Sequence, residues 1–212
     1  MSKRIGIFGT SGFARETADI AYDQGLSPVY IAQDICDLEL NANIGEIILE
    51  TDLYKYRDMT YTIGIGENSV RKKLASKYMS SLKFVNLIHS SATFGLGQRE
   101  RLVDRQGLII CAGSRFTNNI CIGNFSIFNL NCTVGHDTII EDYVNIAPGA
   151  CISGNVQIKN LSWIGTGASI NQGEIDEKLC IGPNTIIGSG SVVVKTCEPD
   201  AVYVGIPAKR IK

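Results

Sequence analysis

Two histidines are the side chains of this sequence best suited to accept a proton near neutral pH, and they lie in different settings. His136 follows Val134 and Gly135, and Asp137 comes directly after it, where a carboxylate can orient an imidazole ring. His89 lies where the pattern of the first half of the chain gives way to that of the second, and we interpret it as structural. The sequence therefore offers one general base, His136, with Asp137 as its partner.

The segment around His136 has an apolar residue at every sixth position. A residue that is mostly small or β-branched follows four positions later, and glycine or asparagine often fills the turn. Each hexad is then one short strand and a corner, and three hexads close a triangular coil, which predicts a left-handed parallel β-helix with stacked internal ladders. The unbroken series is Ile110, Phe116, Ile122, Phe128, Val134, Ile140, Ile146, Ile152, Ile158, Ile164 and Ile170.

The coil period also makes a prediction about the base. Eighteen residues after His136 comes Gly154, at the same corner one coil further on. A glycine leaves its backbone N–H accessible, and neighbouring coils lie roughly 4.8 Å apart. An N–H at that distance can polarise a thioester carbonyl while the base takes the proton of the attacking group.

Two segments interrupt the repeat. Its register slips after Ile170 and resumes at Ile181, Ile187 and Val193, so residues 174–179 are predicted to form an irregular or protruding loop. The charged segment 98–106 lies among the early coils, and the sequence assigns it no role. A β-sandwich is a poor alternative, because sandwich strands repeat less regularly and carry longer loops.

The first half of the chain alternates between strand and helix patterns. Strands are predicted at residues 4–9, 28–32, 61–66 and 83–88, and helices at residues 12–24 and 68–78. This order predicts a small parallel sheet. We therefore expect an α/β plus all-β protein, with a Rossmann-like β-α-β domain over residues 1–86 and the β-helix over residues 87–212.

A glycine-rich turn, Gly9-Thr10-Ser11-Gly12, follows the first strand, and Gly66-Glu67-Asn68 forms a second such turn. Turns of this kind present backbone N–H groups and a helix N-terminus to a phosphate, although plain tight-turn chemistry explains them equally well. The dinucleotide fingerprint lacks its third glycine, so a nucleoside diphosphate fits better. Asp34, after the second strand, lies where a carboxylate can bond a ribose or a base.

Composition excludes several other classes of protein. The net charge of −1 gives no general attraction to nucleic acid or to anionic membranes. The sequence has no apolar run long enough to span a bilayer and starts on a strand pattern rather than a signal peptide, so we expect a cytoplasmic protein. Seven cysteines without a CxxC pair predict no disulfide framework, and two histidines cannot form a three-imidazole zinc site, so we expect no metal.

Together these motifs resemble a known family, the bacterial hexapeptide sugar acetyltransferases. That family includes the UDP-4-amino-sugar N-acetyltransferases of bacillosamine synthesis and the sialic acid O-acetyltransferases. The resemblance covers nearly the whole chain. It rests on Phe8-Gly9-Thr10-Ser11-Gly12, Ile65-Gly66-Glu67-Asn68 with Arg71-Lys72-Lys73, Asn86-Leu87-Ile88-His89, Gly135-His136-Asp137, Ser153-Gly154-Asn155, Trp163-Ile164-Gly165 and Val204-Gly205-Ile206-Pro207-Ala208-Lys209.

The resemblance implies a homotrimer that binds acetyl-CoA between subunits and a nucleotide-sugar on the N-terminal domain. It implies that His136 deprotonates the sugar amine, that the Gly154 N–H contacts the thioester, and that no acyl-enzyme forms. The residues it assigns to pantetheine are Gly165, Thr166, Gly188 and Ser189, and those near the adenosine phosphates are Pro207, Lys209 and Arg210. The residues it assigns to the nucleotide are Gly9, Ser11, Gly12, Asp34, Gly66 and Asn68.

Three positions depart from the family pattern, which leaves the substrate open. Asn145 replaces a second histidine nine residues after the base, Phe13 replaces a histidine after the glycine turn, and Gln33 replaces one of two acidic residues. The nucleotide is therefore UDP, dTDP or CMP on this reasoning, and neither the sugar nor the glycan pathway is determined. The leading hypothesis is N-acetylation of the 4-amino group of a nucleotide-linked 4-amino-4,6-dideoxy sugar. The alternatives are O-acetylation of a sialic acid type of sugar and a non-catalytic trimeric scaffold.

Overall fold

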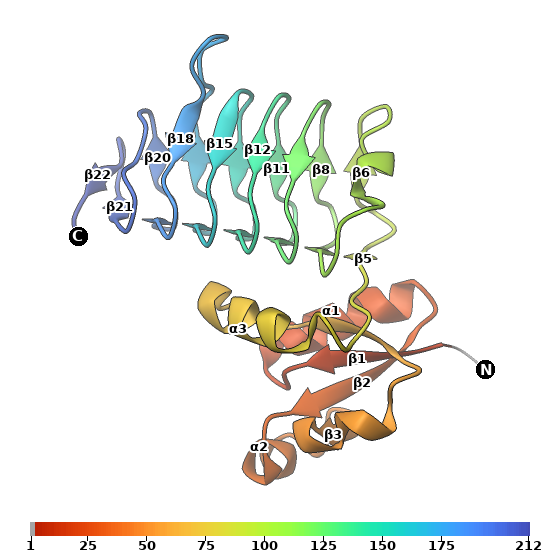
Figure 1. The fold of residues 1–212 in the computed structure, drawn as a ribbon. Helices are drawn as coiled ribbons and strands as arrows, with labels where there is room; N and C mark the ends of the chain where they lie inside the picture. The colour runs from red at the N-terminus through yellow and green to blue at the C-terminus, as the bar shows by residue number, and fades with distance from the viewer. Residues whose placement is uncertain (1–2) are drawn as a thin grey trace.

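The computed structural model describes residues 3–212, so the first two residues of the predicted N-terminal domain lie outside the described residues. Figure 1 shows a small α/β domain beneath a prism of stacked coils, with the C-terminus at the far end of the prism. Within residues 3–212, no helix is long and apolar enough to cross a membrane.

The N-terminal domain has one parallel sheet in the order β3-β2-β1-β4. Its strands are β1 (Arg4–Phe8), β2 (Ser27–Ala32), β3 (Ile47–Leu49) and β4 (Thr60–Ile63), and its helices are α1 (Gly12–Asp23), α2 (Ile35–Leu40), α3 (Asn68–Tyr78) and the 3₁₀ segment η1 (Glu50–Lys55). The predicted β-α-β order is confirmed. Sequence analysis did not anticipate α2 and β3, because α2 is a six-residue helix with no buried residue and so shows no amphipathic period.

Two predicted strands are shorter than expected. Strand β4 ends at Ile63, and the predicted strand 83–88 is not continuous. Phe84 forms a bridge with Tyr61 of the N-terminal domain, whereas Leu87 already pairs with Ile109 of the first coil. The boundary between the two domains lies between these two pairs. The division into residues 1–86 and 87–212 remains our proposal.

The second part of the chain is the predicted left-handed parallel β-helix, with three faces. Face 1 contains β5 (Leu87–Ile88), β7 (Ile109–Ile110), β10 (Ile127–Phe128), β13 (Asn145–Ile146), β16 (Trp163–Ile164), β19 (Ile186–Ile187), β21 (Val202–Val204) and, antiparallel to β21, β22 (Lys209–Arg210). Face 2 contains β6 (Thr93–Phe94), β8 (Arg115–Phe116), β11 (Thr133–Val134), β14 (Cys151–Ile152), β17 (Ser169–Ile170) and β20 (Val192–Val193). Face 3 contains β9 (Cys121–Ile122), β12 (Ile139–Ile140), β15 (Val156–Ile158) and β18 (Leu179–Ile181).

The register of these faces confirms the eighteen-residue coil. Phe128 pairs with Ile146, and Ile146 pairs with Ile164. Every residue of the apolar series is buried, as are the small residues four positions later, such as Ser114 and Ala150. Because each slot stacks on the same slot of the next coil, the period of the sequence becomes the packing of the core.

The corners of the coils explain their turn residues. Three positions after each apolar residue from Ile110 to Ile164 the backbone is left-handed, and most of these positions are glycine, asparagine or aspartate. The exceptions are Phe125, Tyr143 and Leu161, which share the edge between faces 3 and 1. Phe125 is buried there and stacks on Tyr143, with 5.5 Å between ring centroids, in the cluster that contains Phe8 and Phe84 of the N-terminal domain. Burial against that domain compensates for the unfavourable backbone.

The N-terminal domain packs on face 1. The first strands of face 1 have the outward side chains Leu87, Ile109 and Ile127. They are buried with Ile5 and Ile7 of β1 in one apolar cluster. This is why both residues of these short strands are apolar, whereas the outward residues of face 2 include Arg115 and Thr133. Face 1 therefore carries the N-terminal domain.

The two interruptions of the repeat have different structures. Ile158 pairs with Ile181, so this coil is five residues longer than the one from Ile140 to Ile158. The extra residues form the predicted loop, which projects from the prism on the side away from the N-terminal domain (Figure 1). The loop spans residues 171–178 rather than 174–179, because Leu179 begins β18 and is buried.

The segment 98–106 closes the N-terminal end of the β-helix. It contains a 3₁₀ turn, η2 (Glu100–Leu102), and Leu102 is buried in the core of the coils. The Gln98 side chain donates to the Ile120 carbonyl (2.8 Å) and accepts from the Ile120 N–H (2.9 Å). Face 3 has no strand beyond β9, so the Gln98 side chain pairs with the backbone at that open edge. Closing this edge is the structural role of the segment, which the sequence did not reveal.

Candidate active site

His136 and Asp137 lie at the edge between faces 2 and 3, with about half of the His136 side chain exposed. Its Nδ1 lies 2.7 Å from Asp137 Oδ2, while Asp137 Oδ1 accepts a hydrogen bond of 2.6 Å from Asn119 Nδ2. The Asn119 bond and then the His136 bond hold the pKa of Asp137 below its ordinary value. A carboxylate that accepts from Nδ1–H leaves Nε2 with its lone pair free, as a general base requires.

Gly154 lies against the ring of His136, as the coil period predicts. A Cβ placed on Gly154 would come within 2.6 Å of both Cε1 and Nε2 of that ring. Within residues 3–212 the Gly154 N–H donates no hydrogen bond. The structure thus brings a base nitrogen and an unused backbone donor together on one exposed edge, where they can act on the two sides of a carbonyl addition.

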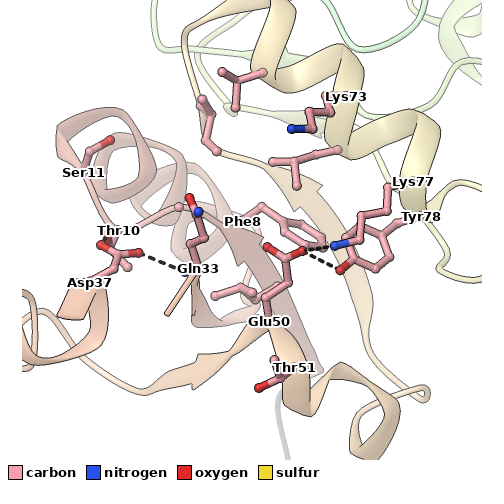
Figure 2. Close-up of a pocket in the computed structure, with 15 residues that line it drawn as sticks. Phe8, Thr10, Ser11, Gln33, Asp37, Glu50, Thr51, Lys73, Lys77 and Tyr78 are labelled. Atoms are coloured by element: carbon pink, nitrogen blue, oxygen red, sulfur yellow. Dashed lines mark hydrogen bonds and ion pairs between the residues drawn. The ribbon is translucent and has the colours of Figure 1, made fainter. Parts of the chain in front are cut away.

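A second candidate site is a cavity of about 640 Å³ in the N-terminal domain, at the carboxyl ends of its strands. Figure 2 shows Thr10, Ser11, Gln33 and Asp37 on one side of this cavity and Lys73 on the other. The cavity opens where β1 lies between β2 and β4, the point at which strand order reverses, and such points are the usual ligand crevice of open parallel sheets.

Some charged side chains of the cavity are bonded to neighbouring residues, and one is not. The Glu50 carboxylate accepts from Lys77 Nζ and from the Tyr78 hydroxyl, both at 2.6 Å. Asp37 accepts from the Thr10 hydroxyl at 2.5 Å and from the Gln33 N–H at 3.1 Å. Lys73 has no ion pair within the described residues. The unpaired ammonium of Lys73 is thus the charge in the cavity that is free to meet an anionic ligand.

The predicted nucleotide residues do not all gather here. Gly9 and Ser11 line the cavity, whereas Gly12, Asp34, Gly66 and Asn68 do not. The Asp34 carboxylate instead caps α2 by accepting from the Asp37 N–H at 2.9 Å. Asn68 is buried, and its amide donates to the carbonyls of Leu161 and Ser162 on the β-helix, while the Gly66 carbonyl accepts from Arg71.

Sequence analysis missed Asp37 and Lys73. The helical period held a signal for Lys73, because one face of α3 lines the cavity at three- and four-residue spacing. That face consists of Val70, Lys73, Leu74, Lys77 and Tyr78. Asp37 gave no comparable signal, because its helix α2 was not predicted.

Comparisons with known proteins agree with this arrangement of domains. Residues 4–78 match the family model described as the PglD N-terminal domain. The chain is 28% identical over 218 aligned residues to a GDP-perosamine N-acetyltransferase of Escherichia coli O157:H7, covering 98% of this chain and 96% of that protein. It is 30% identical to the solved structure of WeeI from Acinetobacter baumannii AYE, with a TM-score of 0.87 over 99% of this chain and 100% of that one. The chain belongs to the hexapeptide-repeat nucleotide-sugar acetyltransferases.

A further structure carries the same combination of domains. The acetyltransferase domain of PglB from Neisseria gonorrhoeae FA1090 is 25% identical, with a TM-score of 0.83 over 99% of this chain and 100% of that one. The chain is therefore an acyltransferase that uses acetyl-CoA, and the hypothesis of a non-catalytic scaffold is wrong. Within residues 3–212, no three His, Cys, Asp or Glu side chains gather as a metal site.

The residues assigned to pantetheine lie on a different edge of the β-helix from the base. A Cβ on Gly165 would lie 2.6 Å from the Ser189 nitrogen, so Gly165-Thr166 and Gly188-Ser189 stack at the edge between faces 1 and 2. Pro207, Lys209 and Arg210 lie at the exposed C-terminal end, where Ala208 N–H donates to the Val192 carbonyl of face 2. A coenzyme that touches these groups and Gly154 must therefore cross face 2.

A methyl group on Gly154 tests the contact with the base. In Gly154→Ala the new Cβ overlaps the His136 ring, so the ring must turn away from its Asp137 partner. We expect kcat to fall by about 10- to 100-fold, the scale on which misplaced catalytic groups lose rate. The melting temperature should change little, because the half-exposed ring can move into solvent. Steady-state thiol release by the variant measures the effect, and wild-type turnover would separate Gly154 from the reaction.

Proposed function

We propose that the enzyme transfers the acetyl group of acetyl-CoA to the 4-amino group of a nucleotide-linked 4-amino-4,6-dideoxy sugar. The observation that carries this proposal is the position of the His136–Asp137 pair against Gly154, whose N–H donates no hydrogen bond within residues 3–212. It is supported by the likeness, over nearly the whole chain, to a protein that N-acetylates GDP-perosamine. Sugar O-acetylation, of the sialic acid type, remains the alternative.

In the proposed reaction, His136 Nε2 accepts a proton from the amine as its nitrogen attacks the thioester carbonyl. The N–C bond forms, and the Gly154 N–H donates to the developing oxyanion. The intermediate then collapses with cleavage of the C–S bond, and the leaving thiolate takes the proton back from the imidazolium. Asp137 keeps the ring oriented and stabilises its charge, and no covalent enzyme intermediate is needed.

The geometry of one chain supports a homotrimer with composite active sites. The N-terminal domain covers face 1, whereas His136 lies on the opposite edge, between faces 2 and 3. The width of the β-helix therefore separates a nucleotide-sugar in the cavity of one chain from His136 of the same chain. We propose that the sugar meets His136 of a second copy, with acetyl-CoA between the two along face 2.

The cavity is the proposed nucleotide site, with Lys73 and the Gly9–Ser11 turn toward the diphosphate. Gly12, the first residue of α1, contributes the N-terminus of that helix to the nucleotide site. In place of Asp34, Gly66 and Asn68, we propose that Asp37 and Lys73 contact the nucleotide. The relative from Escherichia coli adds GDP to the nucleotides considered above, UDP, dTDP and CMP. Since acetyl-CoA and nucleotide-sugars are cytoplasmic metabolites, we propose a cytoplasmic location.

A thiol-release assay with acetyl-CoA and a panel of sugars on GDP, UDP, dTDP and CMP tests the function. We expect turnover with a 4-amino-4,6-dideoxy sugar on one nucleotide and none with its 4-hydroxy counterpart. Turnover only with hydroxyl acceptors would replace N-acetylation by O-acetylation. Lack of turnover with the whole panel would refute both acceptor assignments.

A further inference from the structure

A polar column runs along the edge that carries the base. Asn119, Asp137 and Asn155 occupy the same corner of successive coils, each left-handed, with φ of 56°, 58° and 54°. The pairing of Val156 with Leu179 places Lys178 next in this column, one coil beyond Asn155. Lys178 is the last residue of the protruding loop, so the five-residue insertion ends beside the catalytic corner.

The loop is fastened to that corner by several contacts. Lys178 Nζ donates to the Asp137 carbonyl and, at 3.4 Å, to Asn155 Oδ1. The Gly173 N–H donates to the Gly154 carbonyl, and the Leu179 N–H donates to the Asn155 carbonyl, both at 3.1 Å. Lys178 is half-buried and reaches back past one coil, which a shorter side chain at this position could not do.

The other end of the column is also held by a cation. Asn119, which donates to the Asp137 carboxylate, accepts from Arg101 Nη1 at 3.1 Å. Arg101 belongs to η2 in the segment that closes the end of the β-helix. The charged groups around His136 are therefore Asp137 in direct contact, Lys178 on the Asp137 carbonyl, and Arg101 behind Asn119.

We propose that Lys178 is a positioning residue for acetyl transfer, because its ammonium fixes the Asp137 carbonyl and so holds the left-handed corner from which that carboxylate orients His136. The inference rests on the proposed function of His136 as the base. Aspartate adopts left-handed backbone less readily than glycine does, so a donor on the Asp137 carbonyl stabilises this corner. The Lys178 charge also helps to hold the pKa of Asp137 below its ordinary value, after the larger effects of Asn119 and His136.

Lys178→Met tests this role, because methionine keeps the length of the side chain and removes its charge and donors. We expect kcat to fall by about 10- to 100-fold, while KM for acetyl-CoA changes by less than about threefold. Loss of the Lys178 cation should also raise the pKa of Asp137, which that charge helps to hold down. Lys178→Arg restores the cation and should recover most of the loss. Lys159→Met, at another edge, is the control, since that side chain makes no hydrogen bond within the described residues.

NMR titration of Asp137 without substrate, followed through the ring of His136 that the carboxylate contacts, separates this inference from the proposed function. Only one other histidine, His89, is present, so a His89→Asn background leaves a single imidazole to follow. An upward shift of the Asp137 midpoint in Lys178→Met supports the inference even if no amine is acetylated. Wild-type kcat with an unmoved midpoint would overturn it. So would a loss of kcat that accompanies a lowered melting temperature, leaves the midpoint unmoved and is not rescued by arginine.

Discussion

In His136→Ala, kcat falls by a factor of about 10² or more, as expected when a general base is lost from a reaction that needs proton transfer. Without Nε2 the attacking nitrogen has no acceptor for its proton, while the Gly154 donor and the rest of the coil remain. The fall should appear in kcat more than in KM for acetyl-CoA, because the base acts on the transition state rather than on the bound coenzyme. Thiol release at saturating acetyl-CoA measures it.

His89→Asn is the matched control, since His89 is the other histidine of the chain. Its Nδ1 accepts from the Ser91 N–H at 3.1 Å, and its Nε2 lies 3.9 Å from Asp23 of α1, so it has structural contacts and lies away from Gly154. We expect near wild-type kcat for this control. If His136→Ala and His89→Asn turned over at similar rates, His136 would not be the base. Coenzyme binding by His136→Ala, measured by calorimetry, confirms that the variant is folded.

The second large effect is expected at Arg71, whose guanidinium is completely buried between the two domains. Burial lowers its pKa to about 9, so it is still a cation at neutral pH, although it has no ion pair within the described residues. Its partners are the carbonyls of Ile65 and Gly66, the Asn68 side chain, and the β-helix carbonyls of Phe125, Tyr143 and Val144. The bonds range from 2.7 Å to 3.3 Å.

Arg71→Met leaves the carbonyls of Ile65, Phe125 and Tyr143 without a donor, whereas Gly66 still accepts from Asn145 and Val144 from Ile127. Each carbonyl that finds no water then costs about 1 to 3 kcal/mol. We therefore expect the contact between the domains to lose at least about 3 kcal/mol. The single tryptophan, Trp163, reports on this contact, because its ring carbon Cη2 would lie 3.9 Å from a Cβ on Gly66. Urea titration followed by Trp163 fluorescence should show an earlier transition.

Lys72→Met, on the exposed side of the same helix, is the control for this experiment. The free energy of unfolding of this control should stay within about 0.5 kcal/mol of wild type, as for most surface substitutions. Arg71→Lys retains a charge but cannot reach carbonyls in so many directions, so it should recover only part of the loss. An unchanged Trp163 transition in Arg71→Met would mean that the domains are held together by the apolar face alone.

Stacking makes local spacing a sufficient predictor of the β-helix. A residue six positions after Val134 is buried because it repeats the same slot on the next face, and no distant segment decides this. The same reasoning placed Gly154 against His136, because one coil always adds one strand spacing. Where the period was interrupted it predicted a loop but misplaced its bounds, which are 171–178, and it gave no role to Gln98, whose amide bonds to Ile120.

The nucleotide cavity is different, because its residues come from several strand ends and one helix face. Of the residues that sequence analysis assigned to the nucleotide, Gly9 and Ser11 line this cavity, in the turn that follows β1. Sequence analysis also assigned Asn68 to the nucleotide, whereas the Asn68 amide bonds to the β-helix carbonyls of Leu161 and Ser162. A turn motif shows that backbone N–H groups are available, but only the packing of the domains shows which of them face a cavity.

The sequence by itself thus determined the coil, the base and its neighbour across one coil, since all three follow from a local period. Only the tertiary structure decided that the N-terminal domain covers face 1, with His136 on the opposite edge. It also decided that Arg71 bonds to the β-helix and that Lys178 bonds to the Asp137 carbonyl beside His136. These contacts join residues far apart in the chain through carbonyl oxygens, which every residue carries. Side-chain patterns cannot reveal such partners, because a backbone acceptor has no sequence signature.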